Sequence, residues 1–180
     1  MRPYPLPLTP SSYTPPMRLA SVLLLSLHVT ACGGLSSPLA HSHASPEALA
    51  RAVLEAMERR DAGALNALAL SESEFREHVW PELPAARPER NLPFSYVWGD
   101  LHQKSDAGLR QTLARHGGAK YVLAAIRFKG ETTEYQSYRV HRQSEVTLRD
   151  AQNREQNARL FGSVIEKDGR YKVFSYVTED

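Results

Sequence analysis

Apolar residues in the first half of the chain recur at helical spacing. Leu49, Val53 and Met57 fall three to four positions apart, directly after Ser45-Pro46-Glu47, which supplies a hydroxyl N-cap, a proline at the first helical position and an early acid. This pattern predicts an amphipathic helix over about 46–60. A second short helix is predicted over 64–70. Ser71-Glu72-Ser73-Glu74 then has the spacing of a capping box and predicts a further helical turn.

Prolines at 81, 84, 88 and 93 predict a loop, and helical spacing returns from about 95 to 116, with Gly108 marking an expected kink. From Ala119 onward the period changes to alternation, which predicts strands. The predicted strands are 122–128, one long strand over 135–150, and 158–166 joined to 170–178 by the hairpin signal Asp168-Gly169. We therefore predict an α+β domain, with N-terminal helices packed on a curved, cone-like antiparallel sheet of three to five strands.

The N-terminal region has the pattern of an export signal. Met17-Arg18 is followed by a 13-residue apolar run, 19–31, which is shorter than the roughly 20 residues of a spanning helix. We assign 1–32 to a signal peptide and expect the true start at Met17, with 1–16 untranslated; the alternative is that 1–16 are a disordered extension. The Gly-, Ser- and Pro-rich stretch 33–44 is expected to be a flexible tether, and 45–180 a single domain.

Val29-Thr30-Ala31-Cys32 resembles the lipobox of bacterial lipoproteins. The resemblance implies cleavage before Cys32, lipidation of that cysteine with palmitate among the acyl chains, and anchoring in the cell envelope. Gly33 after the cysteine implies the outer membrane, facing the periplasm. The alternative is an ordinary signal peptide followed by an unpaired cysteine. Cys32 is the only cysteine of the chain, so no intramolecular disulfide is expected.

The predicted order of elements is similar to that of the nuclear-transport-factor-like superfamily, which includes ketosteroid isomerases and SnoaL-like cyclases. The initial helix, the helix before the sheet and the terminal hairpin around 171–176 carry this resemblance. It implies a cone-shaped α+β fold. Its members include enzymes, binding modules and assembly domains, and no motif here transfers their site residues to this chain.

Charge argues against a nucleic-acid partner. The chain carries 22 basic and 20 acidic residues, and both excess cations, Arg2 and Arg18, precede Cys32, so the remaining body is neutral. A neutral body lacks the basic footprint that phosphate binding needs. The usual motifs of nucleotide binding, zinc proteolysis and α/β-hydrolase chemistry are absent from the sequence.

Two groups of residues are candidates for a site. Asp100 and His102 are the catalytic candidates, although a dyad would need a helix break at Gly99 because residues two apart do not face each other. The ligand-binding candidates are Trp98, Tyr135, Arg139 and His141; alternation puts Arg139 and His141 on one face and Arg142 on the other. His41 and His43 are interpreted as solvated linker residues, and neither a metal nor a cofactor is expected.

These observations favour a lipid-anchored envelope protein whose domain is a non-catalytic module for a small molecule or a protein. Partners considered are the membrane, a small-molecule ligand, a second copy of the chain and another envelope protein. The alternatives are an isomerase- or hydrolase-like enzyme with an acid/base pair in a pocket, and a structural or assembly domain that presents an exposed apolar sheet face.

Overall fold

A computed structural model describes residues 37–178 and confirms the α+β class. Helix α1 spans Pro46–Glu58, where predicted; the Ser45 side chain accepts a hydrogen bond from the amide of Ala48, and Pro46 occupies the first turn. Its apolar stripe, which includes Leu49, Val53 and Met57, is buried. Export signal and lipobox, with Cys32, lie outside the described residues.

The segment after α1 is built from short helices. Helix α2 spans Ala62–Leu68, and α3, Glu72–Glu74, begins with the predicted capping box. The chain continues as a π-helical turn, Phe75–Val79, and then as 3-10 turns where a loop was expected. Each of the 3-10 turns has a proline at its first or second position, where the missing amide hydrogen would have no partner within the turn. The 3-10 turns span Trp80–Glu82, Pro84–Ala86 and Pro88–Arg90.

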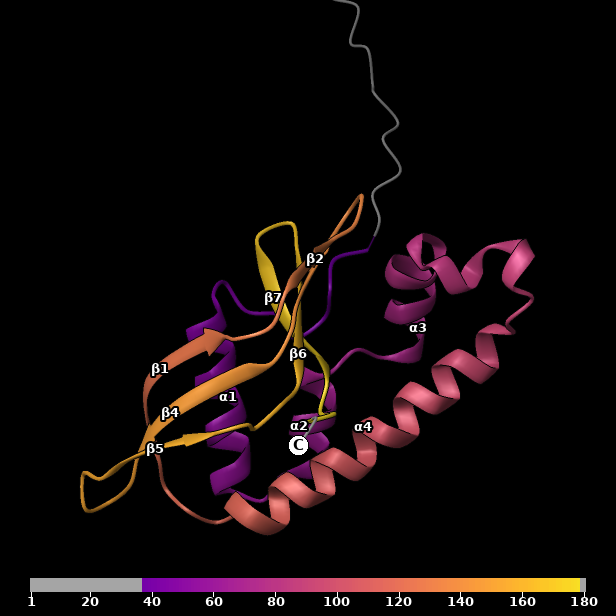
Figure 1. The fold of residues 1–180 in the computed structure, drawn as a ribbon. Coiled ribbons are helices and arrows are strands. Elements are labelled where there is room, and N and C mark those ends of the chain that lie inside the picture. The colour runs from indigo at the N-terminus through magenta and orange to yellow at the C-terminus, as the bar shows by residue number, and fades with distance from the viewer. Residues whose placement is uncertain (1–36, 179–180) are drawn as a thin grey trace, which may run out of the picture. The chain divides into compact units, whose positions relative to one another are not determined.

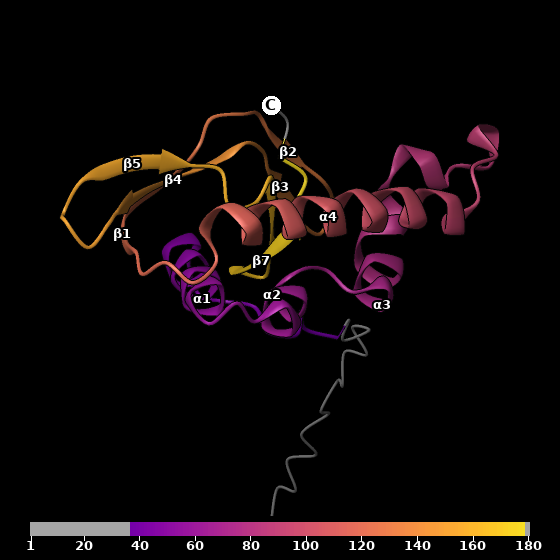
Figure 2. The ribbon, with the colours of Figure 1, turned by 90° about the horizontal axis from the view of Figure 1, so that it is seen from below.

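Helix α4 spans Phe94–His116 and is continuous, so the predicted kink at Gly108 is absent. Gly108 has a different role: a Cβ atom there would lie 2.1 Å from the carbonyl oxygen of Tyr176. Glycine thus lets the helix backbone approach the segment that follows the last strand. In the view of Figure 2, α4 runs across the molecule, with α1, α2 and α3 along one side and strands along the other.

The strands form two open antiparallel sheets, not the single sheet predicted (Figure 1). The first has the order β1-β4-β5 and the second the order β2-β3-β6-β7. The bounds are β1 Val122–Phe128, β2 Thr132–Glu134, β3 Arg139–His141, β4 Ser144–Arg149, β5 Glu155–Ala158, β6 Ser163–Lys167 and β7 Arg170–Ser175.

Two predicted strands are each divided between the sheets. The predicted strand 135–150 breaks at Gln143, whose φ of 52° is left-handed, so β3 lies in one sheet and β4 in the other. The predicted strand 158–166 is also interrupted. Its first residue, Ala158, is the last residue of β5, and β6 begins only after residues 159–162. The β6–β7 hairpin forms as predicted, with positive φ at Asp168 (51°) and Gly169 (69°).

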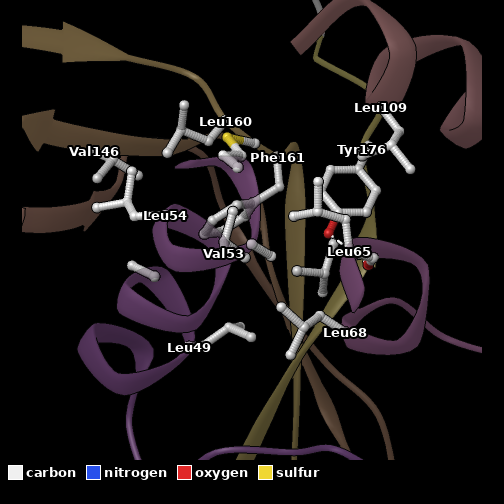
Figure 3. Close-up of a cluster of buried hydrophobic side chains, with 14 of the residues drawn as sticks. Leu49, Val53, Leu54, Leu65, Leu68, Leu109, Val146, Leu160, Phe161 and Tyr176 are labelled. Carbon is white, nitrogen blue, oxygen red and sulfur yellow. Dashed lines mark hydrogen bonds between the residues drawn. The ribbon is translucent and has the colours of Figure 1, made fainter. Parts of the chain in front are cut away.

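Two hydrophobic clusters stabilise the fold. The larger joins α1 and α2 to both sheets, and Tyr176 lies fully buried in it, its hydroxyl donating to the Leu65 carbonyl at 2.7 Å (Figure 3). Burial raises the pKa of this phenol. The second cluster contains Phe75, Val140 and Ile165, with the N-terminal half of α4 packed against it. The described residues thus form one compact unit with its own buried core.

Residues 37–44 belong to this folded unit, which corrects the predicted tether. Leu39 is buried, and His43 and Tyr171 exchange two backbone hydrogen bonds of 2.8 Å. The amide of Ala40 donates to Glu74 Oε1 at 2.8 Å. Because the apolar and hydrogen-bonding partners of this stretch lie far along the chain, its local composition did not reveal that it is ordered. No helix in the described part is long and apolar enough to cross a membrane.

Candidate ligand cavity

A cavity of about 440 Å³ lies between α4 and the strands, within the usual size range for small-molecule sites of about 300–1,000 Å³. Its apolar lining comes from α4, the π-helical turn, both sheets and the segment after β7. These residues are Phe75, Leu83, Val97, Leu101, Tyr135, Val140, Phe161, Phe174 and Val177.

One stripe of α4 forms the helical wall. Val97, Leu101 and Lys104 line the cavity together with Asp100, at the three- and four-residue spacing that puts helical side chains on one face. The Phe75 ring, itself part of the lining, packs against α4, 5.3 Å from the Trp98 ring centroid, and lies 6.3 Å from the ring centroid of Phe174. The wall is therefore held in place by aromatic packing.

The opposite wall includes the point where the chain crosses from β3 to β4. Arg142, Gln143 and Ser144 line the cavity there. In the sequence, Arg142 and Ser144 interrupt the apolar face of the predicted strand 135–150, which suggests a bend or a polar lining, and the structure shows both. The amide of Gly130 donates to the Arg142 carbonyl at 3.2 Å and that of Lys129 to the Gln143 carbonyl at 3.0 Å. These backbone bonds fix the crossing in spite of its left-handed residue.

Five charged side chains also line the cavity, three of them basic (Lys104, Arg142, Arg159) and two acidic (Asp100, Glu131). Lys104 Nζ pairs with Asp100 Oδ2 at 2.8 Å. Arg142 donates from Nε to Thr133 Oγ1 at 3.4 Å, and among residues 37–178 it has no ion pair within 4.0 Å. Arg142 is therefore a basic group of the lining whose charge no acidic side chain of the described part neutralises by a direct ion pair.

A carboxylate fastens the turn between β2 and β3 to the 3-10 turns. Glu82 accepts hydrogen bonds from the amides of Gln136 and Ser137 and from the Ser137 hydroxyl. Leu83 and Tyr135, the chain neighbours of these groups, both line the cavity. This contact joins two parts of the lining that are more than 50 residues apart in sequence.

The structure does not bring the two catalytic candidates together. Helix α4 is unbroken at Gly99, so Asp100 faces the cavity whereas His102 lines a neighbouring one of about 390 Å³ between α2, α3 and α4. There His102 stacks on Trp98, with 5.3 Å between ring centroids, and lies 3.5 Å from Asp106. No Asp100–His102 dyad forms.

Of the ligand-binding candidates, Tyr135 lines the main cavity, where its ring stacks on Tyr138 with 4.4 Å between centroids. Trp98 lines the neighbouring cavity. The Tyr138 hydroxyl is buried and donates to the Val79 carbonyl at 3.4 Å, and burial raises the pKa of this group. Of the two stacked tyrosines, Tyr135 therefore lines the cavity, whereas Tyr138 belongs to the core.

Arg139 and His141 share one face of β3, as alternation predicts, but Val140 and not these two residues lines the cavity. Both contact Glu166, at 3.5 Å for Arg139 and 2.8 Å for His141. The second ring nitrogen of His141 lies 3.0 Å from Thr132 Oγ1. Both nitrogens of this imidazole therefore have partners, which suits a structural role on the sheet.

Beside the cavity, Lys172 is 2 % exposed and pairs with Glu74 at 2.9 Å. Lys172 also donates to the carbonyl of Ala40 at 2.6 Å. Burial alone would raise the pKa of Glu74, but hydrogen bonds from Ser71 and Lys172 and the lysine charge outweigh it, so this pKa is lowered. The capping carboxylate is thus also half of a buried ion pair, which the sequence did not reveal.

Of the charged residues of the lining, sequence reasoning selected only Asp100, and Arg142 and Arg159 are among those that it missed. Arg142 had a usable signal, because alternation placed it opposite Arg139 at the interruption of an apolar face. Arg159 had none, since it stood inside a predicted continuous strand that the structure breaks.

The arrangement suits binding better than proton transfer. The carboxylates of the main cavity, Asp100 and Glu131, belong to exposed residues, and Asp100 is neutralised by Lys104. Within residues 37–178 no group of three or more His, Cys, Asp or Glu residues is placed to hold a metal ion. His43 is packed on the domain, where burial and the charge of Arg170 lower its pKa.

Comparisons with protein-family models, with curated protein sequences and with solved structures found no match to the chain, so its resemblance to the nuclear-transport-factor-like superfamily stays a prediction.

Proposed function

We propose that residues 37–178 form a non-catalytic binding module that takes a small molecule with a largely apolar body into the cavity beside α4. The observation that carries this proposal is the 440 Å³ space, lined by aromatic and aliphatic side chains together with charged groups on exposed residues. Such a lining buries apolar ligand surface, and each buried methylene is worth about 0.8 kcal/mol.

The two alternatives have less support. An isomerase- or hydrolase-like enzyme would use an acid or base sequestered in the pocket, whereas the acidic residues of the cavity are exposed. An assembly domain would present a broad apolar sheet face. The large exposed hydrophobic residues of the described part are only Leu92, Tyr96 and Val122, which lie on three separate elements or loops.

Filling the cavity from its helical wall tests the proposal. The probe is N-phenyl-1-naphthylamine, an uncharged apolar dye whose fluorescence rises on binding, titrated into the chain from residue 36 onward. We expect one saturable site per chain, and at least a fivefold loss of affinity in Val97→Trp because the larger side chain occupies the space.

Tyr96→Trp is the matched control, because Tyr96 neighbours Val97 on α4 but is 66 % exposed and does not line the cavity. Its affinity for the dye should equal that of the parent chain. Absence of a saturable site, or equal affinity in Val97→Trp when circular dichroism shows that it is folded, would overturn the proposal.

We also propose that the module is held at the cell envelope by a lipid on Cys32 after removal of the signal peptide, in the outer membrane facing the periplasm. The support is the lipobox-like sequence Val29-Thr30-Ala31-Cys32. In cells fed a labelled fatty acid, the parent chain should take up label and Cys32→Ser should take up none and accumulate as precursor. Labelled Cys32→Ser would refute the anchor without touching the binding proposal.

A further inference from the structure

The cavity is lined by two chemically different kinds of residue, buried or half-buried apolar ones and exposed charged ones. The apolar side chains of Phe75, Leu101 and Phe174 come from the tightly packed region between α4 and the second sheet. The charged side chains stand on exposed residues of α4 and of the loops that link the strands. A ligand that contacts both kinds of residue favourably has an apolar body and one polar end.

The charged residues of the lining indicate which charge the polar end of the ligand carries. Lys104 pairs with Asp100 at 2.8 Å, whereas Arg142 has no ion pair within 4.0 Å in the described part of the chain. Arg142 donates from Nε to Thr133 Oγ1. Its two terminal amino groups make no hydrogen bond of 3.5 Å or less to any described residue. A guanidinium edge with two parallel donors matches a carboxylate, and arginine binds such planar anions better than lysine does.

From these two observations we infer that the ligand is an amphipathic monoanion, with its hydrocarbon part against the aromatic lining and its carboxylate at Arg142. This inference rests on the proposed binding function and adds the class of ligand. Because Arg142 is exposed to solvent, its charge contributes about tenfold selectivity for an anionic over a cationic ligand, and the apolar contacts supply most of the affinity.

Three ligands with the same ten-carbon chain and different head groups test the inference: decanoate, 1-decanol and decylammonium. Each displaces N-phenyl-1-naphthylamine from the chain beginning at residue 36, at 20 mM and again at 500 mM salt. We expect decanoate to bind about tenfold more tightly than decylammonium at low salt, with the difference shrinking at high salt because the rim charges are screened.

The variant Arg142→Gln removes the guanidinium and retains a side chain of similar length. We expect it to lower the affinity for decanoate about tenfold and to lower that for 1-decanol less than twofold. Arg149→Gln is the matched control, since Arg149 pairs with Glu155 in the other sheet and does not line the cavity. It should bind all three ligands as the parent chain does.

The outcomes separate the two proposals. Binding of 1-decanol with no preference for decanoate over decylammonium, or equal decanoate affinity in Arg142→Gln, overturns the monoanion and leaves the binding function standing. If the dye binds but none of the three ligands displaces it, the amphipathic monoanion is overturned alone. If the dye itself finds no saturable site, the binding function fails and the ligand class falls with it.

Discussion

Lys172 is a buried cation at which three separate segments of the chain meet. Its ammonium contacts the carboxylate of Glu74 and the carbonyl of Ala40, and Glu74 in turn accepts from the amides of Ser71 and Ala40. Each polar group of this cluster has a partner, so the cost of burying the charges is offset. Losing one member leaves the others buried without that compensation.

We expect Lys172→Met to destabilise the domain by about 3–5 kcal/mol, because it leaves the Glu74 carboxylate buried without its counter-charge. Urea denaturation followed by circular dichroism measures the change. Adding Glu74→Gln to Lys172→Met should recover part of the loss, since the remaining buried charge is then removed. A double variant less stable than Lys172→Met alone would refute this account of the pair.

At this scale the sequence was informative about Glu74 but not about its partner. The capping box is a local pattern, so Ser71 and Glu74 could be paired from their spacing. Lys172 lies 98 residues away and stands at an inward position of a strand, where a charged residue has no local signal. Arg142 lies between these cases, since alternation gave its face but not the cavity in front of it.

Elements were predictable where the apolar period is long and unbroken. Helices α1 and α4 and the β6–β7 hairpin follow from spacing, capping and turn residues. The division of 135–150 into β3 and β4 followed only in part. The interruption of the apolar face at Arg142 and Ser144 suggests a bend, but it does not indicate that the backbone turns at Gln143 into a second sheet. A turn without glycine or proline leaves little trace in the sequence.

The contact between Glu82 and the β2–β3 turn gives a prediction at this scale. In Glu82→Ala the amides of Gln136 and Ser137 lose their acceptor, so we expect their hydrogen exchange to accelerate about tenfold. Exchange measured by NMR at single residues reports this directly. The core amide of Val173 should exchange as before.

Glu89→Ala is the control for this experiment. Glu89 occupies the last of the same 3-10 turns but is exposed and makes no hydrogen bond to the β2–β3 turn. Equal exchange of Gln136 and Ser137 in the two variants would show that Glu82 does not hold the turn.

At the scale of the whole molecule, the class of fold could be predicted and the placement of its parts could not. Helices followed by alternating segments indicate α+β, but one sheet and two sheets have the same local pattern. The lining of the cavity combines residues of α4, of both sheets and of the β3–β4 crossing. No stretch of sequence contains that arrangement, since its lining comes from residues as far apart as 75 and 178.

The domain boundary is testable in the same way. A chain that starts at residue 45, the boundary predicted from composition, loses Leu39 from the core, the His43–Tyr171 bonds and the Ala40 contacts. We expect it to be less stable than a chain from residue 36 by about 3 kcal/mol, measured by urea denaturation. Equal stability would restore the predicted boundary and show that residues 37–44 add nothing to the fold.

The pairing of residues 40–43 with 170–172 also sets the order of assembly. The hydrogen bonds that Lys172 and Arg170 donate to this stretch span 132 and 128 residues. Residues 40–43 can therefore make these bonds only after nearly the whole domain has been synthesised. Contacts of such long range form late and slowly. A chain that crosses a membrane N-terminus first would therefore still lack its closing strand during passage, and would complete its fold only on arrival.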